Sequence, residues 1–230
     1  MIKNLKLKTK GSNSGVTYVE LIVVLSIFAI ISAVSLFNYR DFQARIDIKN
    51  LANDIALRIV QAQKFALSGK QTEKSVVTPW RPSYGVYFNL TVTGNPVDTG
   101  NNIFYSFVNN DNAIPQSQFF DKAFSFCPPT LDITHECLGK ITIAKAKISA
   151  IDECDTEDCA TPVRAISDDL HITFTRPNSE ASIFRTVSGV SQKMTEANHY
   201  IRIKVESLNN PKIKSSVRVY PQGRVQVNVN

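Results

Sequence analysis

Several features that mark large classes of proteins are missing from this sequence. It has only nine Gly and ten Pro among 230 residues and no internal repeat, which excludes collagen-like and low-complexity chains. The signatures G-x-S-x-G, H-E-x-x-H and G-x-x-x-x-G-K-[ST] are absent, and His135, His171 and His199 are scattered. We therefore expect neither an enzyme nor a cofactor. A content of 43% hydrophobic and 20% charged residues excludes a wholly disordered chain and a multi-span membrane protein.

Acidic residues are absent from the first 15 positions, which carry Lys3, Lys6, Lys8 and Lys10. The formal charge of the chain is +6, from 26 Lys and Arg against 20 Asp and Glu. Without residues 1–15 the balance is 22 against 20, or +2. The basicity therefore belongs mainly to the N-terminus, and it favours a membrane-orienting signal over a DNA-binding surface.

Charges are also nearly absent from residues 16–37, where Glu20 is the single charged residue, and neither Pro nor Gly occurs from Val16 to Ser68. About 20 apolar residues are enough to cross a bilayer as a helix. The preceding lysines predict a single-pass segment with a cytoplasmic N-terminus and an exterior remainder. A secretory signal peptide is a rival interpretation, since Ser32–Ser35 could imitate a cleavage site, but its apolar core would be shorter. A plain signal anchor would leave Glu20 unexplained.

The stretch Gly15-Val16-Thr17-Tyr18-Val19-Glu20-Leu21, between a lysine-rich leader and an apolar helix, resembles the prepilin signal of type IV pilins and pseudopilins. The resemblance implies a leader of residues 1–15, removed by prepilin peptidase after Gly15, and N-methylation at Val16. It also implies that Glu20 helps to dock the subunit into a filament. The partners would be other pilin subunits, the peptidase, a membrane assembly platform and, before assembly, membrane lipid. The family usually has Phe where this chain has Val16.

Residues 38–69 are expected to continue the helix, and residues 70–230 to form an exterior β-rich domain. Apolar residues recur at roughly helical spacing in the first part, and Gly69 is a plausible C′ residue; the stripe consists of Phe42, Ile46, Leu51, Ile55, Ile59, Ala62 and Ala66. Alternating patterns and turn residues predict strands at 83–90, 102–108, 140–144, 170–175, 181–184, 199–206, 215–220 and 224–229. The fold class is therefore α+β, with one long N-terminal helix packed on an antiparallel sheet, the pilin fold.

A finer resemblance, to the GspH/FimT pseudopilin family, rests on apolar patterning at 57–69, 171–174, 200–203 and 219–225. It implies a minor pilin or pseudopilin of a type IV pilus or a type II secretion-like filament. The alternative function is a signal-anchored exterior binding module, such as a DNA-uptake minor pilin. Some DNA-binding members carry, after a Gly near the C-terminus, two Arg on either side of one residue, and here Gly223-Arg224-Val225-Gln226 lacks the second Arg. Arg218 and Arg224 are candidate nucleic-acid contacts, although a solvated strand face is the favoured interpretation.

The four cysteines, Cys127, Cys137, Cys154 and Cys159, all fall in the expected exterior domain. Their even number favours disulfides, with neighbour pairing 127–137 and 154–159 as one of three connectivities. Their spacing matches zinc sites poorly. The segment 152–158 holds five carboxylates, and Asp152, Asp155 and Asp158 are calcium candidates; without EF-hand spacing, an exposed acidic loop closed by a disulfide is favoured.

Overall fold

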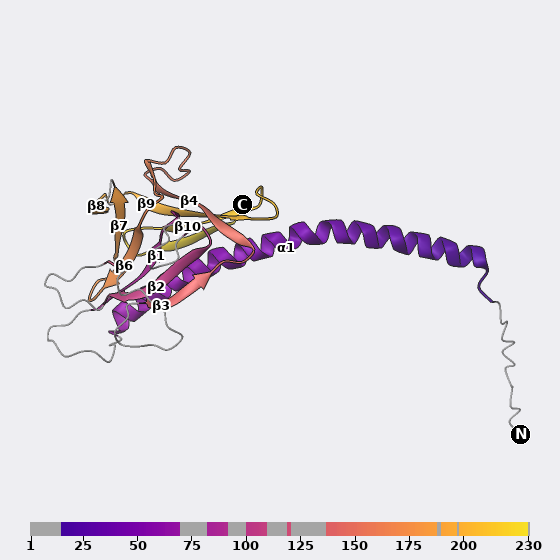
Figure 1. Ribbon diagram of the computed structural model, residues 1–230, viewed down its shortest axis with the longest axis horizontal. Coiled ribbons are helices and arrows are strands. Elements are labelled where there is room, and N and C mark those ends of the chain that lie inside the picture. Colours follow the sequence, from indigo (N-terminus) through magenta and orange to yellow (C-terminus); the bar gives the residue numbers. More distant parts are fainter. Residues whose placement is uncertain are drawn as a thin grey trace, which may run out of the picture. The chain divides into compact units, whose positions relative to one another are not determined.

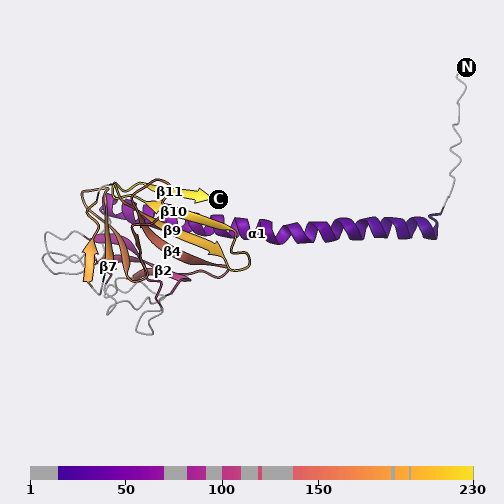
Figure 2. The same ribbon diagram turned by 90° about the horizontal axis from the view of Figure 1, so that it is seen from above.

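The computed structural model describes residues 15–69, 82–91, 100–109, 119–120, 137–187, 190–196 and 198–229. The chain divides into two compact units, which meet between Phe42 and Gln43. A single helix, α1 (Tyr18–Ser68), runs through this boundary. The second unit combines the rest of α1 with antiparallel sheets (Figures 1 and 2), so the predicted α+β class is confirmed.

Helix α1 has local signals at both ends and no breaker between them. Thr17 Oγ1 accepts the backbone N–H of Glu20 at 3.3 Å, which makes Thr17 the N-cap residue. Gly69 has a φ of +62°, the left-handed conformation of a C′ glycine, and its N–H donates to the carbonyl of Ala66 at 3.3 Å. The predicted helix end at Ser68 is confirmed, and the helix begins two residues after Val16 because Thr17 caps it.

All strand pairs in the second unit are antiparallel among the described residues, and they form two sheets. The six-stranded sheet has the order β3 (Cys137–Thr142), β2 (Ile103–Asn109), β1 (Ser83–Phe88), β6 (Leu170–Thr175), β7 (Ala181–Val187) and β8 (Val190–Lys193). The five-stranded sheet has the order β11 (Val225–Val229), β10 (Lys214–Val219), β9 (Tyr200–Ser207), β4 (Ala146–Cys154) and β5 (Arg164–Ala165). Eight of the strands match predicted ones; β4, β5 and β8 were not expected.

One apolar core joins the later part of α1 to both sheets. The buried helix residues are spaced three or four apart and comprise Ala44, Ile48, Ala52, Ile55, Ile59, Ala62 and Ala66. The predicted stripe is confirmed from Ile55 onward, but its start was wrong, because Phe42 is 61% exposed and Ile46 is only half-buried. The face of α1 that packs on the sheets is therefore the one with Ala44, Ile48 and Ala52.

The six-stranded sheet is also covered on its other face, where an aromatic cluster lies. Its buried members are Tyr87, Tyr105, Phe107 and Phe120, joined by Cys137. Strand β1 is therefore buried along its whole length. A Cβ at Gly85 would lie 2.7 Å from the Phe107 ring and 2.6 Å from the carbonyl of Ile172, so the close packing of β1 against its neighbours requires glycine there.

Candidate functional site

The peptide bond between Gly15 and Val16 lies in exposed, non-helical backbone. The first turn of α1 begins beyond it, with the N–H of Leu21 donating to the carbonyl of Thr17 at 3.1 Å. Because Thr17 is the N-cap, Glu20 occupies the third helical position, where a carboxylate is favoured by the positive end of the helix dipole. Gly15, Val16 and Glu20, which the sequence singled out together, thus lie within one short exposed segment.

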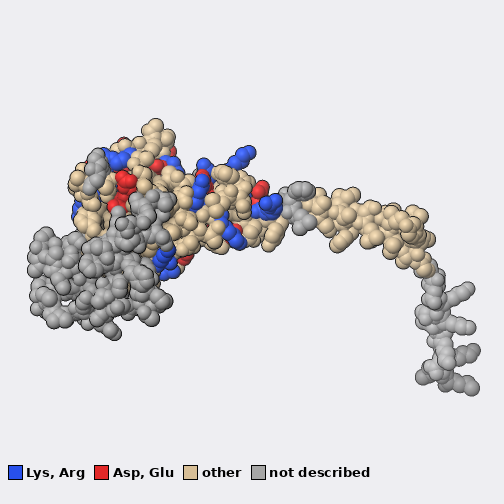
Figure 3. Space-filling model, in the orientation of Figure 1, with Lys and Arg blue, Asp and Glu red and all other residues tan. Residues whose placement is uncertain are grey.

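The first part of α1 exposes apolar side chains on every side. Its large apolar residues from Tyr18 to Val34 are 45% to 76% exposed. Figure 3 shows this segment with an uncharged surface in that view, whereas Lys, Arg, Asp and Glu side chains gather on the second unit. The helix is long and apolar enough to span a membrane. A soluble monomer rarely exposes an apolar patch above a few hundred Å².

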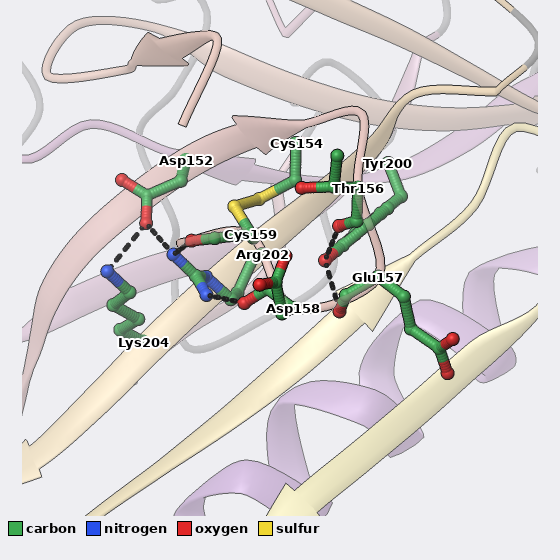
Figure 4. Close-up of a disulfide and its surroundings, with 9 residues drawn as sticks. All are labelled: Asp152, Cys154, Thr156, Glu157, Asp158, Cys159, Tyr200, Arg202 and Lys204. Atoms are coloured by element: carbon green, nitrogen blue, oxygen red, sulfur yellow. Dashed lines mark hydrogen bonds and ion pairs between the residues drawn. A yellow bond between two sulfur atoms is a disulfide. The ribbon is translucent and has the colours of Figure 1, made fainter. Parts of the chain in front are cut away.

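The predicted 154–159 disulfide is present, and the loop that it closes is fastened to strand β9 (Figure 4). The hydroxyl of Tyr200 donates to the carbonyls of Thr156 and Glu157 at 3.0 and 3.1 Å. Arg202 donates to the carbonyls of Asp158 and Cys159 at 3.2 and 3.0 Å. Cys137 is also disulfide-bonded, and Cys127 lies outside the described residues.

The three calcium candidates occupy different environments. Asp152 is buried in β4, and its Oδ2 forms ion pairs with Arg202 at 2.9 Å and with Lys204 at 2.8 Å. Asp155 and Asp158 are exposed on the disulfide-closed loop. The expected exposed acidic loop is therefore right for its later residues and wrong for Asp152 and Glu153, which are buried strand residues. The Asp152 carboxylate already has two cationic partners, so it is poorly suited to hold a cation.

A second charged cluster, which the sequence did not reveal, joins the two sheets. Glu153 on β4 is 1% exposed, and its Oε2 lies 3.0 Å from Nε of Arg185 on β7. Its Oε1 lies 2.8 Å from Nδ1 of His199. Backbone N–H groups of Glu196 and Thr195 hold the pKa of the Glu196 carboxyl below its ordinary value, with smaller help from Arg185.

Glu153, Glu196 and His199 are also the one group of metal-ligating side chains that lies close together in the described part of the chain. Their ligand atoms lie within 4.8 Å of one another. Arg185 already pairs with Glu153, and a divalent cation would have to compete with that guanidinium. We therefore interpret Glu153, Arg185 and His199 as an ion-pair network and not as a metal site. No residue spacing in the sequence could have found it, because the partners come from different sheets.

The candidate nucleic-acid contacts lie on the face of the five-stranded sheet that points away from the core. Arg218 pairs in register with Arg202, and the Arg218 guanidinium lies 5.4 Å from the centre of the Tyr200 ring. The Arg224 guanidinium lies 3.9 Å from the centre of the Tyr220 ring. Among the described residues, neither arginine forms an ion pair with a carboxylate. They face aromatic rings, which favour a cation.

The segment around Asp168 and His171, which superficially resembles part of a catalytic group, is a structural network. Nδ1 of buried His171 accepts the backbone N–H of Phe120 at 3.1 Å. Asp169 accepts hydrogen bonds from Tyr87 and Asn89. His135 lies outside the described residues.

No protein-family model, curated protein or solved structure matches this chain. The resemblance to pilins therefore rests on the N-terminal residues and on the pilin-like architecture, a long apolar helix packed on antiparallel sheets.

Proposed function

We propose that this chain is a structural subunit, a minor pilin or pseudopilin, of a type IV pilus or type II secretion-like filament. The observation that carries the proposal is the difference in burial between the first and the later part of α1. Residues from Tyr18 to Val34 expose apolar side chains all round, and residues from Ala44 onward close the core of a β domain. The first part of the helix is thus an apolar rod, and its later part belongs to the core of a folded domain.

The apolar rod fits two successive environments. The helical residues 18–37 span about 30 Å at 1.5 Å per residue, enough for a hydrocarbon core of about 30 Å. Before assembly the segment would lie in the membrane, with the N-terminus cytoplasmic. In the filament, the same side chains would pack against the helices of other subunits. Both environments remove the exposed apolar surface from water, which stabilises each state by about 25 cal/mol per Å² buried.

Processing at Gly15 would place two charges at the start of the rod. Cleavage by prepilin peptidase would give Val16 a free α-amino group, four residues before Glu20. In an apolar environment, an unpaired charge is costly, and pairing lowers the cost of both. Pairing of Glu20 with the N-terminus of a neighbouring subunit would therefore set the register of assembly. The assembly platform would supply subunits, and a separate cytoplasmic ATPase would supply the force.

The cap geometry gives Glu20 a second role that an experiment must separate from docking. At the third helical position, its carboxylate also stabilises the helix start. We expect Glu20→Gln to abolish incorporation into filaments while the protein remains in the membrane. Thr17→Val, the matched control, removes the cap hydroxyl and costs about 1 kcal/mol of helix stability but keeps the charge. Equal incorporation of Glu20→Gln and wild-type subunits, measured by immunogold labelling of sheared filaments, would contradict the proposed docking role.

Nucleic-acid binding is the second candidate function, and the outer face of the five-stranded sheet favours it. Arg218 and Arg224 lie there without carboxylate partners among the described residues, and Lys204 lies on the same face. A DNA-binding subunit predicts affinity that falls steeply with salt and is lost on changing both arginines to Ala. The filament role alone predicts no effect. Fluorescence anisotropy with duplex DNA at two salt concentrations distinguishes them, with Arg45→Ala as the control on exposed helix surface.

A further inference from the structure

A cavity of about 200 Å³ lies between helix α1 and the six-stranded sheet. The helix contributes polar and aromatic side chains, and strands β2 and β3 contribute the opposite wall; the residues that matter are Arg58, Gln61, Phe65, Ser106 and Leu138. An engineered apolar cavity of about 150 Å³ is large enough to bind benzene. This cavity therefore has room for a ring or a short alkyl chain, and it differs from an apolar void in having donors on its wall.

Arg58 is the group that gives the cavity a chemical preference. Its Nη1 donates to Oε1 of Gln61 at 3.5 Å, a long hydrogen bond. Its Nε is buried and has no hydrogen-bond partner among the described residues, and no described carboxylate lies within ion-pair distance. The edge of a guanidinium formed by Nε and Nη2 is the edge that binds a carboxylate through two parallel hydrogen bonds. In Arg58 this edge is the one that Gln61 leaves free.

The remaining walls suit an apolar body attached to that carboxylate. Phe65 on α1 and Leu138 on β3 line the cavity, whereas the Phe107 ring belongs to the aromatic cluster on the other face of the sheet. An anion without an apolar part would leave these walls unfilled, whereas a long acyl chain would exceed the volume.

We infer that this cavity binds a small monocarboxylate with an apolar body of about six to eight carbons, its carboxylate paired with Arg58 and its body between Phe65 and Leu138. Filament assembly does not need such a site, so the inference goes beyond the proposed function. The ligand would also provide the missing partner for a buried donor, whose unsatisfied burial otherwise destabilises the folded domain.

The test uses the full chain in detergent, labelled with ¹⁵N-arginine, and hexanoate as the probe. We expect a saturable shift of the Arg58 Nε–H resonance with hexanoate and none with 1-hexanol, which has the same chain without the charge. Arg58→Met should weaken hexanoate binding, measured by calorimetry, by about 10- to 100-fold, the usual effect of losing hydrogen bonds to a charged group. Arg45→Met, on the exposed part of the same helix, should bind as the wild type does.

A second variant keeps the inference open to refutation if Arg58→Met fails to fold. Leu138→Trp adds bulk to the apolar wall and leaves Arg58 in place, so it should reduce hexanoate affinity by about tenfold or more while the Arg58 resonance remains that of a folded protein. Equal binding of hexanoate and 1-hexanol, or no saturation in the wild type, would overturn the inference and leave a cavity that holds only water. Unchanged affinity in both Leu138→Trp and Arg58→Met would overturn it as well, because binding would then lie elsewhere.

Discussion

Replacement of Glu153 by Gln is expected to destabilise the β domain strongly, because one buried carboxylate holds two groups together. Glu153 lies on β4 in one sheet, and Arg185 lies on β7 in the other. Their side chains are 1% and 7% exposed, and the Nε–Oε2 distance is 3.0 Å. Nε and Nη1 of Arg185 and Oε2 of Glu153 are buried without a hydrogen bond among the described residues, so the guanidinium depends on the charge of Glu153 for compensation.

The magnitude follows from what the substitution leaves behind. Removing one member of a buried ion pair costs about 3–5 kcal/mol, because the other charge remains buried and uncompensated. The amide introduced by Glu153→Gln could still form a hydrogen bond with His199, since an amide both donates and accepts, but would carry no charge opposite Arg185. With a urea m-value of about 2 kcal/mol per M, the unfolding midpoint should fall by about 1.5–2.5 M. Arg185→Met in the same chain should restore much of the loss, because it removes the unpaired charge.

Urea titration of the full chain in detergent, followed by near-ultraviolet circular dichroism, measures these midpoints. The unfolding free energies of the wild type, the Glu153→Gln variant, the Arg185→Met variant and the double variant together give the coupling energy between the two side chains. The matched control is Glu206→Gln, since Glu206 pairs with the partly exposed Lys147 and Lys214 and should cost less than about 1 kcal/mol. A loss below about 1 kcal/mol for Glu153→Gln, or strict additivity in the double variant, would refute the reasoning.

Three further perturbations test the packing, the disulfide and the buried phenols. Ala52→Leu should overpack the helix–sheet contact and cost about 1–3 kcal/mol of unfolding free energy, whereas the same change at exposed Asn53 should cost little, by the same urea assay. Replacing Cys154 and Cys159 by Ser opens a loop with a sequence separation of 5 and should cost about 2 kcal/mol; no difference between reduced and oxidised protein would contradict this. Burial raises the pKa of Tyr84 to about 12, so the unfolded chain loses this proton first, near its ordinary value of about 10. The stability that Tyr84 contributes is therefore complete below about pH 10 and declines between about pH 10 and 12, and Tyr84→Phe should flatten the decline in midpoints measured across that range.

The helix and most strands could be predicted because their signals are local. Thr17, the absence of Pro and Gly, and Gly69 determine α1 without reference to the rest of the chain. Strict alternation marks β9 and β10, because buried residues alternate with more exposed ones along these strands. Strands β5 and β8 were missed because two and four residues are too few to show a period.

Strand β4 and its charges could not be predicted, for a reason visible in its pairing. The register with β9 shifts between Ile148 and Ala150, and this bulge interrupts the alternation that marks a strand. Asp152 and Glu153 then look like the start of an exposed acidic loop. Only the fold brings Arg202 beside Asp152 and Arg185 beside Glu153, and these contacts span many residues of sequence.

The helix face was predicted only in part because hydrophobicity alone does not choose between two apolar sides. Phe42 and Ile46 are more hydrophobic than Ala44, but Ala44 is buried in the core whereas Phe42 is exposed and Ile46 only half-buried. Nothing in the sequence alone distinguishes Arg58 from the other charged residues of the helix. Its place beside a cavity depends on Ser106 and Leu138, which are remote in sequence.

The most direct test of the central claim is the N-terminus and mass of the protein extracted from membranes, with and without a Gly15→Val substitution. The filament-subunit account predicts a mature chain that starts at Val16, with an added methyl group on its amine, and loss of this processing in the Gly15 variant. An intact Met1, or a cut near Ala33, would contradict the account, because either result would mean an anchored or secreted β-rich domain instead of a processed filament subunit.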